Sequence, residues 1–170
     1  MCVIRRCFSS LATTIYGSLV IDDNDSTPQL SSTLSAFMGS FVRPANAYVH
    51  WLEAALTTSH DTASSEFRIG IRRLKSTPPN PLFAAAYFGF KVCSHLWEPN
   101  TSDPNCINNA QETLLYVASS QGHAATVRLL LNGGADINRP AHRGNTAPLL
   151  VAIRRHNSKV LDLLLDFEQN

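Results

Sequence analysis

Apolar residues recur at helical spacing twice within residues 113–138, and a glycine separates the two stretches. Leu115 lies on the apolar side of the first stretch, and Val127 and Leu130 lie on that of the second. Glycine adopts a left-handed conformation at little cost, so Gly122 is well placed to end the first helix. The pattern predicts a helix, a short turn and a second helix.

The same pattern recurs on both sides of this segment. Leu82, Leu115 and Leu149 hold equivalent places, 33 and then 34 positions apart. A period in the low thirties is typical of solenoids in which pairs of helices stack on one another. We therefore predict an all-α, helix-turn-helix solenoid of about three units. They span about 80–112 (unit 1), 113–145 (unit 2) and 146–170 (unit 3), the last of them truncated.

Helix-capping residues mark the ends of the predicted helices. Asn80 and Thr113 each precede an apolar stretch, and their side chains can accept a hydrogen bond from a first-turn N–H. Gly89 corresponds to Gly122 at the end of the first helix, whereas unit 3 has His156 at this place. This departure and others like it predict degenerate repeats and a stack of modest stability.

Polar turn residues recur with the same period in the loops between units. Asp103 and Asn105 precede Asp136 and Asn138 by 33 positions. Asp and Asn favour turns because their side chains bond to the backbone two residues on. The repeat therefore extends through loops that otherwise share little sequence.

Three helix-like stretches precede the units, with apolar residues at helical spacing in 30–41, 47–56 and 67–74. Pro44 suits a first helical position, and the Pro-Pro-Asn-Pro run at 78–81 cannot lie inside a helix. We predict a small helical domain at residues 29–77 that packs on unit 1. Residues 1–28 are predicted to be a poorly ordered segment with an acidic linker.

The leucines, glycines and turn residues of 113–138 resemble the ankyrin repeat. Its pattern runs Thr-Pro-Leu-His-x-Ala-Ala-x-x-Gly-His, then Val-x-Leu-Leu and Gly-Ala-Asp-x-Asn. The resemblance covers about residues 80–170, and Phe83, Tyr116 and Leu150 stand where the family has the His of Thr-Pro-Leu-His. It implies a protein–protein interaction module or scaffold that is not an enzyme and uses no cofactor.

Ankyrin-type repeats resemble one another in binding partners through loop tips and the inner face of their first helices. In this chain, that inner face corresponds to Tyr87, Phe88, Ser120, Gln121, Arg154 and Arg155. The loops contribute Asn108, Glu112, Arg139, His142, Arg143 and Asn145. Tyr and Arg are common energetic anchors at interfaces, which favours Tyr87 and the arginines at 143, 154 and 155. The alternatives are packing of the two aromatic residues on the N-terminal helices and a solvated face for the arginines.

A second resemblance concerns the segment before the repeats. The run Tyr48-Val49-His50-Trp51-Leu52 is similar to the Tyr-x-x-Trp-Leu motif before the first repeat of fungal NACHT–ankyrin proteins. It implies, as an alternative, a truncated fragment of an intracellular immune-type receptor. The chain has no Gly-x-x-x-x-Gly-Lys-[Ser/Thr] phosphate-binding loop, so the nucleotide function of such receptors does not transfer.

Composition narrows the classes of partner. The 170 residues carry a formal net charge of +1, and neither half is strongly basic. Nucleic acid and anionic membranes attract strongly basic surfaces, so this balance argues against both. The charge-free stretches are too short and too rich in Ser and Thr for a transmembrane helix. We expect another protein as the partner.

The cysteines suggest a compartment. Cys2, Cys7, Cys93 and Cys106 lack the paired spacing of zinc sites and of secreted disulfide scaffolds. Free thiols in the reducing cytoplasm or nucleus fit this spacing. Residues 1–21 contain two arginines, many Ser and Thr and no acidic residue, which leaves mitochondrial targeting as the alternative.

A Cys/His enzyme is a further alternative for the function. Cys93, His95, Asp103 and Cys106 include the groups that a nucleophile, a base and an orienting acid require. However, Cys93 and His95 are two positions apart on a predicted helix and point to different sides. A zinc site that adds His123 lacks paired ligand spacing. We therefore predict no catalytic residue and no metal site.

The last predicted helix is apolar where a terminal unit usually carries polar residues. Its apolar residues are Val160, Leu161, Leu164, Leu165 and Phe167. We predict an apolar C-terminal face that associates with a second copy or another chain, or that is covered by the continuation of a longer gene product.

Overall fold

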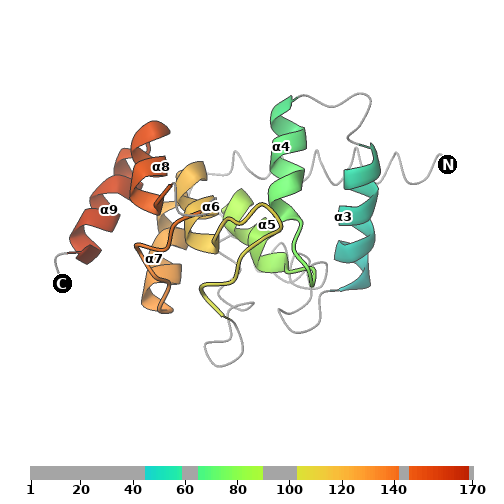
Figure 1. Cartoon of the computed structure of the whole chain (residues 1–170), viewed down its shortest axis with the longest axis horizontal. Helices are drawn as coiled ribbons and strands as arrows, with labels where there is room; N and C mark the ends of the chain where they lie inside the picture. The colour runs from blue at the N-terminus through green and yellow to red at the C-terminus, as the bar shows by residue number, and fades with distance from the viewer. Residues whose placement is uncertain (1–44, 59–64, 90–102, 142–145, 169–170) are drawn as a thin grey trace, which may run out of the picture. The chain divides into compact units, whose positions relative to one another are not determined.

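The computed structural model describes residues 45–58, 65–89, 103–141 and 146–168 (Figure 1). All secondary-structure elements in these ranges are helices, as predicted. They are α3 (Asn46–Thr58), α4 (Ser65–Leu74), α5 (Pro81–Phe88), α6 (Leu114–Gln121), α7 (Ala124–Asn132), α8 (Pro148–Arg154) and α9 (Ser158–Glu168). The predicted segment 1–28, the stretch 30–41, Pro44 and the second helix of unit 1 lie outside the described residues.

The predicted caps begin the first helices of units 1 and 2. The Leu82 N–H donates to Asn80 Oδ1 at 2.9 Å, and the Tyr116 N–H donates to Thr113 Oγ1 at 3.1 Å. Each bond satisfies one N–H that has no partner within its own helix. Both N-cap predictions are confirmed.

The left-handed residues that end these helices sit where the sequence predicts them. Gly89 has φ 72° and Gly122 has φ 83°. His156 occupies the same place in unit 3 and adopts the same conformation, with φ 57°. A side chain makes this conformation costly, so unit 3 has the geometry of the repeat without its preferred residue.

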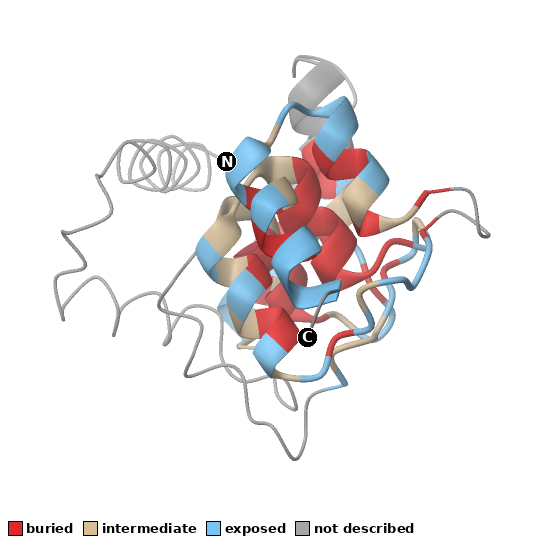
Figure 2. Cartoon of the chain, turned by 90° about the vertical axis from the view of Figure 1, so that its left-hand side faces the viewer, coloured by how far each residue is buried: buried red, intermediate tan, exposed pale blue. Residues whose placement is uncertain are grey.

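The first helices of successive units pack on one another, α5 on α6 and α6 on α8, while α7 packs on α9 (Figure 1). Phe83 and Val117 are fully buried between helices, and Tyr116 of unit 2 clusters with Ala141 and with Val151 of unit 3. Figure 2 shows the buried residues gathered between the helices. The core is therefore built by contacts between neighbouring units, as in a solenoid.

Polar side chains also connect neighbouring units at equivalent places. His123 Nε2 lies 3.0 Å from the Tyr87 carbonyl oxygen, in the last turn of α5. Asn157 Nδ2 donates to the Ser119 carbonyl oxygen at 2.8 Å, in the last turn of α6. These residues follow Gly122 and His156 directly, so an Asn in unit 3 binds the last turn of the preceding first helix as a His does in unit 2, one carbonyl earlier.

The loops repeat their geometry as well. The Asn105 N–H donates to Asp103 Oδ1 at 2.8 Å, and the Asn138 N–H donates to Asp136 Oδ1 at 2.9 Å. The Asp136 N–H also donates to Asn105 Oδ1 at 2.8 Å, which joins the two loops. The 33-residue register predicted for these loops is confirmed.

Helices α3 and α4 lie on the N-terminal side of the repeats. Tyr48 and Leu52 of α3 are buried, as are Ile71 and Leu74 of α4, and α4 packs on α5. All described residues fall within one compact unit, 33–170. The limits of a separate helical domain at 29–77 stay a prediction.

Candidate protein-binding surface

Three equivalent positions run along the inner face of the first helices: Tyr87, Ser120 and Arg154. Tyr87 is half-buried because α4 packs against it, and a Cβ added at Gly70 would collide with its ring and hydroxyl. Phe88 meets the Tyr87 ring edge-on, with 5.1 Å between ring centroids. Both aromatic residues therefore contribute to packing at the N-terminal end of the stack.

The side chain of Arg73 extends from α4 towards unit 2. It contacts Ser120, the second of these three positions. Its Nε lies 3.1 Å from Glu112 Oε1, and its Nη1 donates to Ser120 Oγ at 3.0 Å. The guanidinium carbon lies 6.0 Å from the centroid of the Tyr116 ring. The side chains of Arg73 and Glu112 are 12% and 2% exposed, so this is a buried ion pair.

Asn108 completes the surroundings of this pair. Its Nδ2 donates to the Arg73 carbonyl oxygen at 2.8 Å and to Glu112 Oε2 at 3.1 Å. Its Oδ1 accepts from the Ala110 and Glu112 N–H groups at 2.9 and 2.8 Å. A buried charge is tolerated when such hydrogen bonds satisfy it. We call Arg73, Asn108, Glu112 and Ser120 the arginine cluster.

The arginine cluster corrects part of the predicted surface. Asn108, Glu112 and Ser120 are 2%, 1% and 5% exposed, so they are not available to a partner at this surface. Asn108 and Glu112 hold α4 to the loop of unit 1 instead, and Ser120 holds it to unit 2. Sequence reasoning overlooked Arg73 because it resembles its exposed neighbour Arg72 in a run of charged residues.

The remaining predicted residues are more accessible. Arg139, Arg154 and Arg155 are exposed, and Gln121 is half-buried with its Nε2 3.4 Å from Ser120 Oγ. The other predicted loop residues, His142, Arg143 and Asn145, lie outside the described residues.

One glutamate and three arginines make up the charged surroundings of Tyr116. Burial raises the pKa of Tyr116, and the Glu112 carboxylate raises it further. Arg73, Arg154 and Arg155 act in the opposite direction and lower this pKa. Because Glu112 already pairs with Arg73, the two exposed arginines give this end of the inner face a positive character.

The groups considered for catalysis have structural contacts. Burial is the main cause that raises the pKa of the Cys106 thiol to about 12, followed by the charge of Asp103. Asn80 Nδ2 donates to Cys106 Sγ at 3.3 Å. A thiol with so high a pKa is protonated at neutral pH and is a poor nucleophile. Cys93 and His95 lie outside the described residues.

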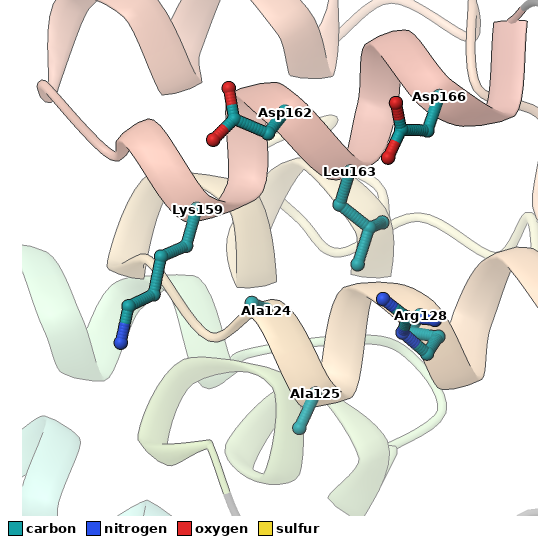
Figure 3. Close-up of a pocket in the computed structure, with 7 residues that line it drawn as sticks. All are labelled: Ala124, Ala125, Arg128, Lys159, Asp162, Leu163 and Asp166. Carbon is teal, nitrogen blue, oxygen red and sulfur yellow. The ribbon is translucent and has the colours of Figure 1, made fainter.

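A groove of about 270 Å³ lies between α7 and α9 (Figure 3). Its lining residues are Ala124, Ala125, Arg128, Lys159, Asp162, Leu163 and Asp166. Leu163 points from α9 towards α7, and charges of both signs surround it in the close-up. Mixed charge selects no one class of ligand, so we assign no binding role to this groove. Among the described residues, no group of three or more His, Cys, Asp or Glu is placed to hold a metal ion.

The model of one protein family matches the chain. It is described as ankyrin repeats in three copies, and it covers residues 78–170. The match does not reach the segment at 48–52, so the NACHT–ankyrin resemblance of that segment stays a prediction. No curated protein matches the chain. None of the helices in the described ranges is long and apolar enough to cross a membrane.

Proposed function

Because the chain belongs to the ankyrin repeat family, we propose that it is a non-catalytic scaffold that binds an acidic segment of another protein. Ankyrin repeats are generally protein–protein interaction modules, and three copies cover more than half of this chain. The observation that carries the finer proposal is the distribution of charge on the inner face. Its exposed end carries Arg154 and Arg155, whereas the charge of Arg73 is paired with Glu112.

The proposed surface extends from unit 2 to unit 3. It consists of Gln121 and Arg154 on the first helices, Arg155 directly after α8 and Arg139 on the loop. The loop residues His142, Arg143 and Asn145 belong to the same proposal from their place in the repeat. Arginine forms paired hydrogen bonds with carboxylates, and it is enriched among residues that anchor interfaces. Tyr87 and Phe88 contribute by holding α4 in place.

We also propose that the protein acts in the cytoplasm or nucleus. Cys106 is a free thiol that accepts a hydrogen bond from Asn80, so the fold uses it in its reduced form. A fluorescent fusion of the full chain tests this proposal. Accumulation in mitochondria or in the secretory pathway would show that it is wrong.

Selection of peptides from a phage-displayed library on the immobilised chain tests the acidic partner. We expect enriched peptides to be rich in Asp and Glu, and their affinity to fall as salt is added. The variant Arg155→Glu should weaken binding of a selected synthetic peptide at least roughly tenfold, because it places a like charge on the surface. Fluorescence anisotropy measures the dissociation constant.

The matched control is Arg128→Glu, which makes the same change of charge at an exposed arginine of α7. This variant should bind the selected peptide like the original chain. Equal loss in both variants would show that only the net charge matters. Enrichment of peptides without acidic residues would contradict the proposed partner chemistry.

A further inference from the structure

Four positions on α6 and α7, the helices that pack against unit 3, are buried. Tyr116, Ser119, Val127 and Leu131 are 6%, 0%, 0% and 9% exposed. The equivalent residues of unit 3, 34 positions later, are Leu150, Ile153, Leu161 and Leu165. Three of them are 38%, 48% and 40% exposed, and Leu161 is half-buried. Unit 3 therefore presents an apolar surface at the positions that the repeat uses for stacking, which we call the stacking face.

Figure 2 looks towards the side of the chain on which α8 and α9 lie, and exposed segments of helix stand nearest the viewer. All four residues of the stacking face are aliphatic, and they come from both helices of unit 3. A cluster of exposed aliphatic residues on neighbouring helices marks a candidate interaction site in soluble proteins.

The size of Ile153 distinguishes between possible occupants. The equivalent residues of units 1 and 2 are Ala86 and Ser119, and both are buried on helices that pack against the next unit. Small residues at this position let the first helices of successive units approach closely. Ile153 is larger by several carbon atoms, so another repeat at the same spacing would collide with it. A separate molecule can pack at a larger distance from α8 than a further repeat can, so it fits the stacking face better.

The charges at the borders of the stacking face indicate which occupant this is. Arg154 lies at the end of α8, beside the turn into α9, and Glu168 lies at the far end of α9. Arg154 is four positions from Leu150, and Glu168 is three positions from Leu165, so each shares a helix side with the apolar residues. One end of the face is thus basic and the other is acidic.

A second copy of the chain has the complementary arrangement. A two-fold axis that lies in the stacking face, perpendicular to the line from Arg154 to Glu168, reverses the direction of the second copy. The basic end of each copy then meets the acidic end of the other, while aliphatic residues meet at the centre. Isologous contacts of this kind are the commonest way in which soluble proteins form dimers.

We propose that Leu150, Ile153, Leu161 and Leu165 form the interface of a symmetric dimer of this chain, in which Arg154 of each copy lies near Glu168 of the other. The dimer does not depend on the proposed acidic partner. Arg154 lies at the border of both surfaces, whereas Arg155 is left to the partner.

Sedimentation velocity of the full chain over a roughly hundredfold range of concentration tests the proposal, because dimerisation follows mass action. We expect a reversible monomer–dimer equilibrium. The variant Ile153→Glu places a charge at the centre of the interface and should raise the dissociation constant at least roughly a hundredfold. A chain that stays monomeric at every concentration would overturn the proposal.

The matched control is Ile107→Glu, because Ile107 is 40% exposed but lies on the loop of unit 1. It should leave the dimer unchanged. Circular dichroism establishes that both variants fold. If Ile153→Glu does not fold, Ile153→Ser introduces the residue of unit 2 and should raise the dissociation constant about tenfold. A dimer insensitive to residue 153 would show that the interface lies elsewhere.

Reversal of charge tests the second copy specifically. Arg154→Glu and Glu168→Arg should each weaken the dimer, because each places like charges opposite one another. The double variant restores opposite charges between the copies and should recover the affinity of the original chain. Failure to recover it would overturn the antiparallel arrangement. Arg155→Glu should leave the dissociation constant of the dimer unchanged. This difference from Arg154→Glu separates the dimer interface from the surface that binds the acidic partner.

Discussion

At the N-terminal end of the repeats, α4 covers unit 1 and extends Arg73 into unit 2, whereas at the C-terminal end Leu150 and Ile153 lie exposed on unit 3. The first end is completed by the polar groups of the arginine cluster, which bond to one another. The second end presents aliphatic side chains. Polar contacts require one geometry, while aliphatic surfaces accept several, so the difference separates a fixed end from an end that is open to association.

The largest effect should come from removing the centre of the arginine cluster. Arg73→Ala leaves the Glu112 carboxylate buried without its cation, and loss of one partner of a buried ion pair costs about 3–5 kcal/mol. Urea unfolding followed by circular dichroism measures the change in the free energy of unfolding.

Arg72→Ala is the control for this prediction, because Arg72 is the exposed neighbour on the same helix. It should change the free energy of unfolding little. Equal effects of the two substitutions would show that the arginine cluster does not stabilise the N-terminal end. The double variant Arg73→Met with Glu112→Leu should recover much of the loss, because no unpaired charge remains buried.

A smaller effect is expected at the turn of unit 2. Gly122→Ala forces a side chain into the left-handed conformation, which costs about 1–2 kcal/mol. The added Cβ would also lie 2.9 Å from Oδ1 of Asn157, whose Nδ2 donates to the Ser119 carbonyl oxygen and holds unit 3 to unit 2. Gly134→Ala is the control, because Gly134 has φ 84° and no neighbouring atom within 4 Å of an added Cβ. If both variants lose the same stability, the contact with Asn157 contributes nothing.

The opposite change in unit 3 should stabilise the protein. His156→Gly relieves the left-handed conformation of a non-glycine residue, and the greater freedom of glycine in the unfolded chain offsets part of the gain. We expect a net increase of about 0.5–1 kcal/mol in the free energy of unfolding. A decrease would mean that the His156 side chain makes a contact worth more than the strain.

The smallest effect should be a dependence of stability on pH. His123, which joins unit 2 to unit 1, can titrate, whereas Asn157, which joins unit 3 to unit 2, cannot. Burial lowers the pKa of His123, and the hydrogen bond to the Tyr87 carbonyl opposes this shift. The folded state therefore binds the proton less well than the unfolded chain. The contribution of neutral His123 to the free energy of unfolding is complete above about pH 6.5. It is lost as the pH falls through the lowered pKa of the folded state.

His123→Asn introduces the residue that unit 3 uses at this place. Thermal melting between neutral and mildly acidic pH should show a weaker pH dependence in this variant than in the original chain. If the melting temperature of the variant changes with pH as much as that of the original chain, the protonation of His123 does not differ between the folded and unfolded states.

Much of the repeat could be predicted from sequence because its signals are local. The hydrogen bonds of Asn80 and Thr113 and the turn at Gly122 involve residues within a few positions of one another. The arginine cluster could not be predicted in this way, because Arg73 and Glu112 are brought together by the packing of α4. The sequence indicated an apolar last helix, but the exposure of Ile153 needed the structure.

The stacking of neighbouring units also affects how readily each unit opens locally. Unit 2 is held from both sides, whereas unit 3 packs on α6 and α7 of unit 2. Local opening of a segment requires less free energy when fewer contacts break. Amide hydrogens of α8 and α9 should therefore exchange with solvent sooner than those of α6, and occupation of the stacking face should slow them. Hydrogen exchange would then report association as a delay confined to the last two helices.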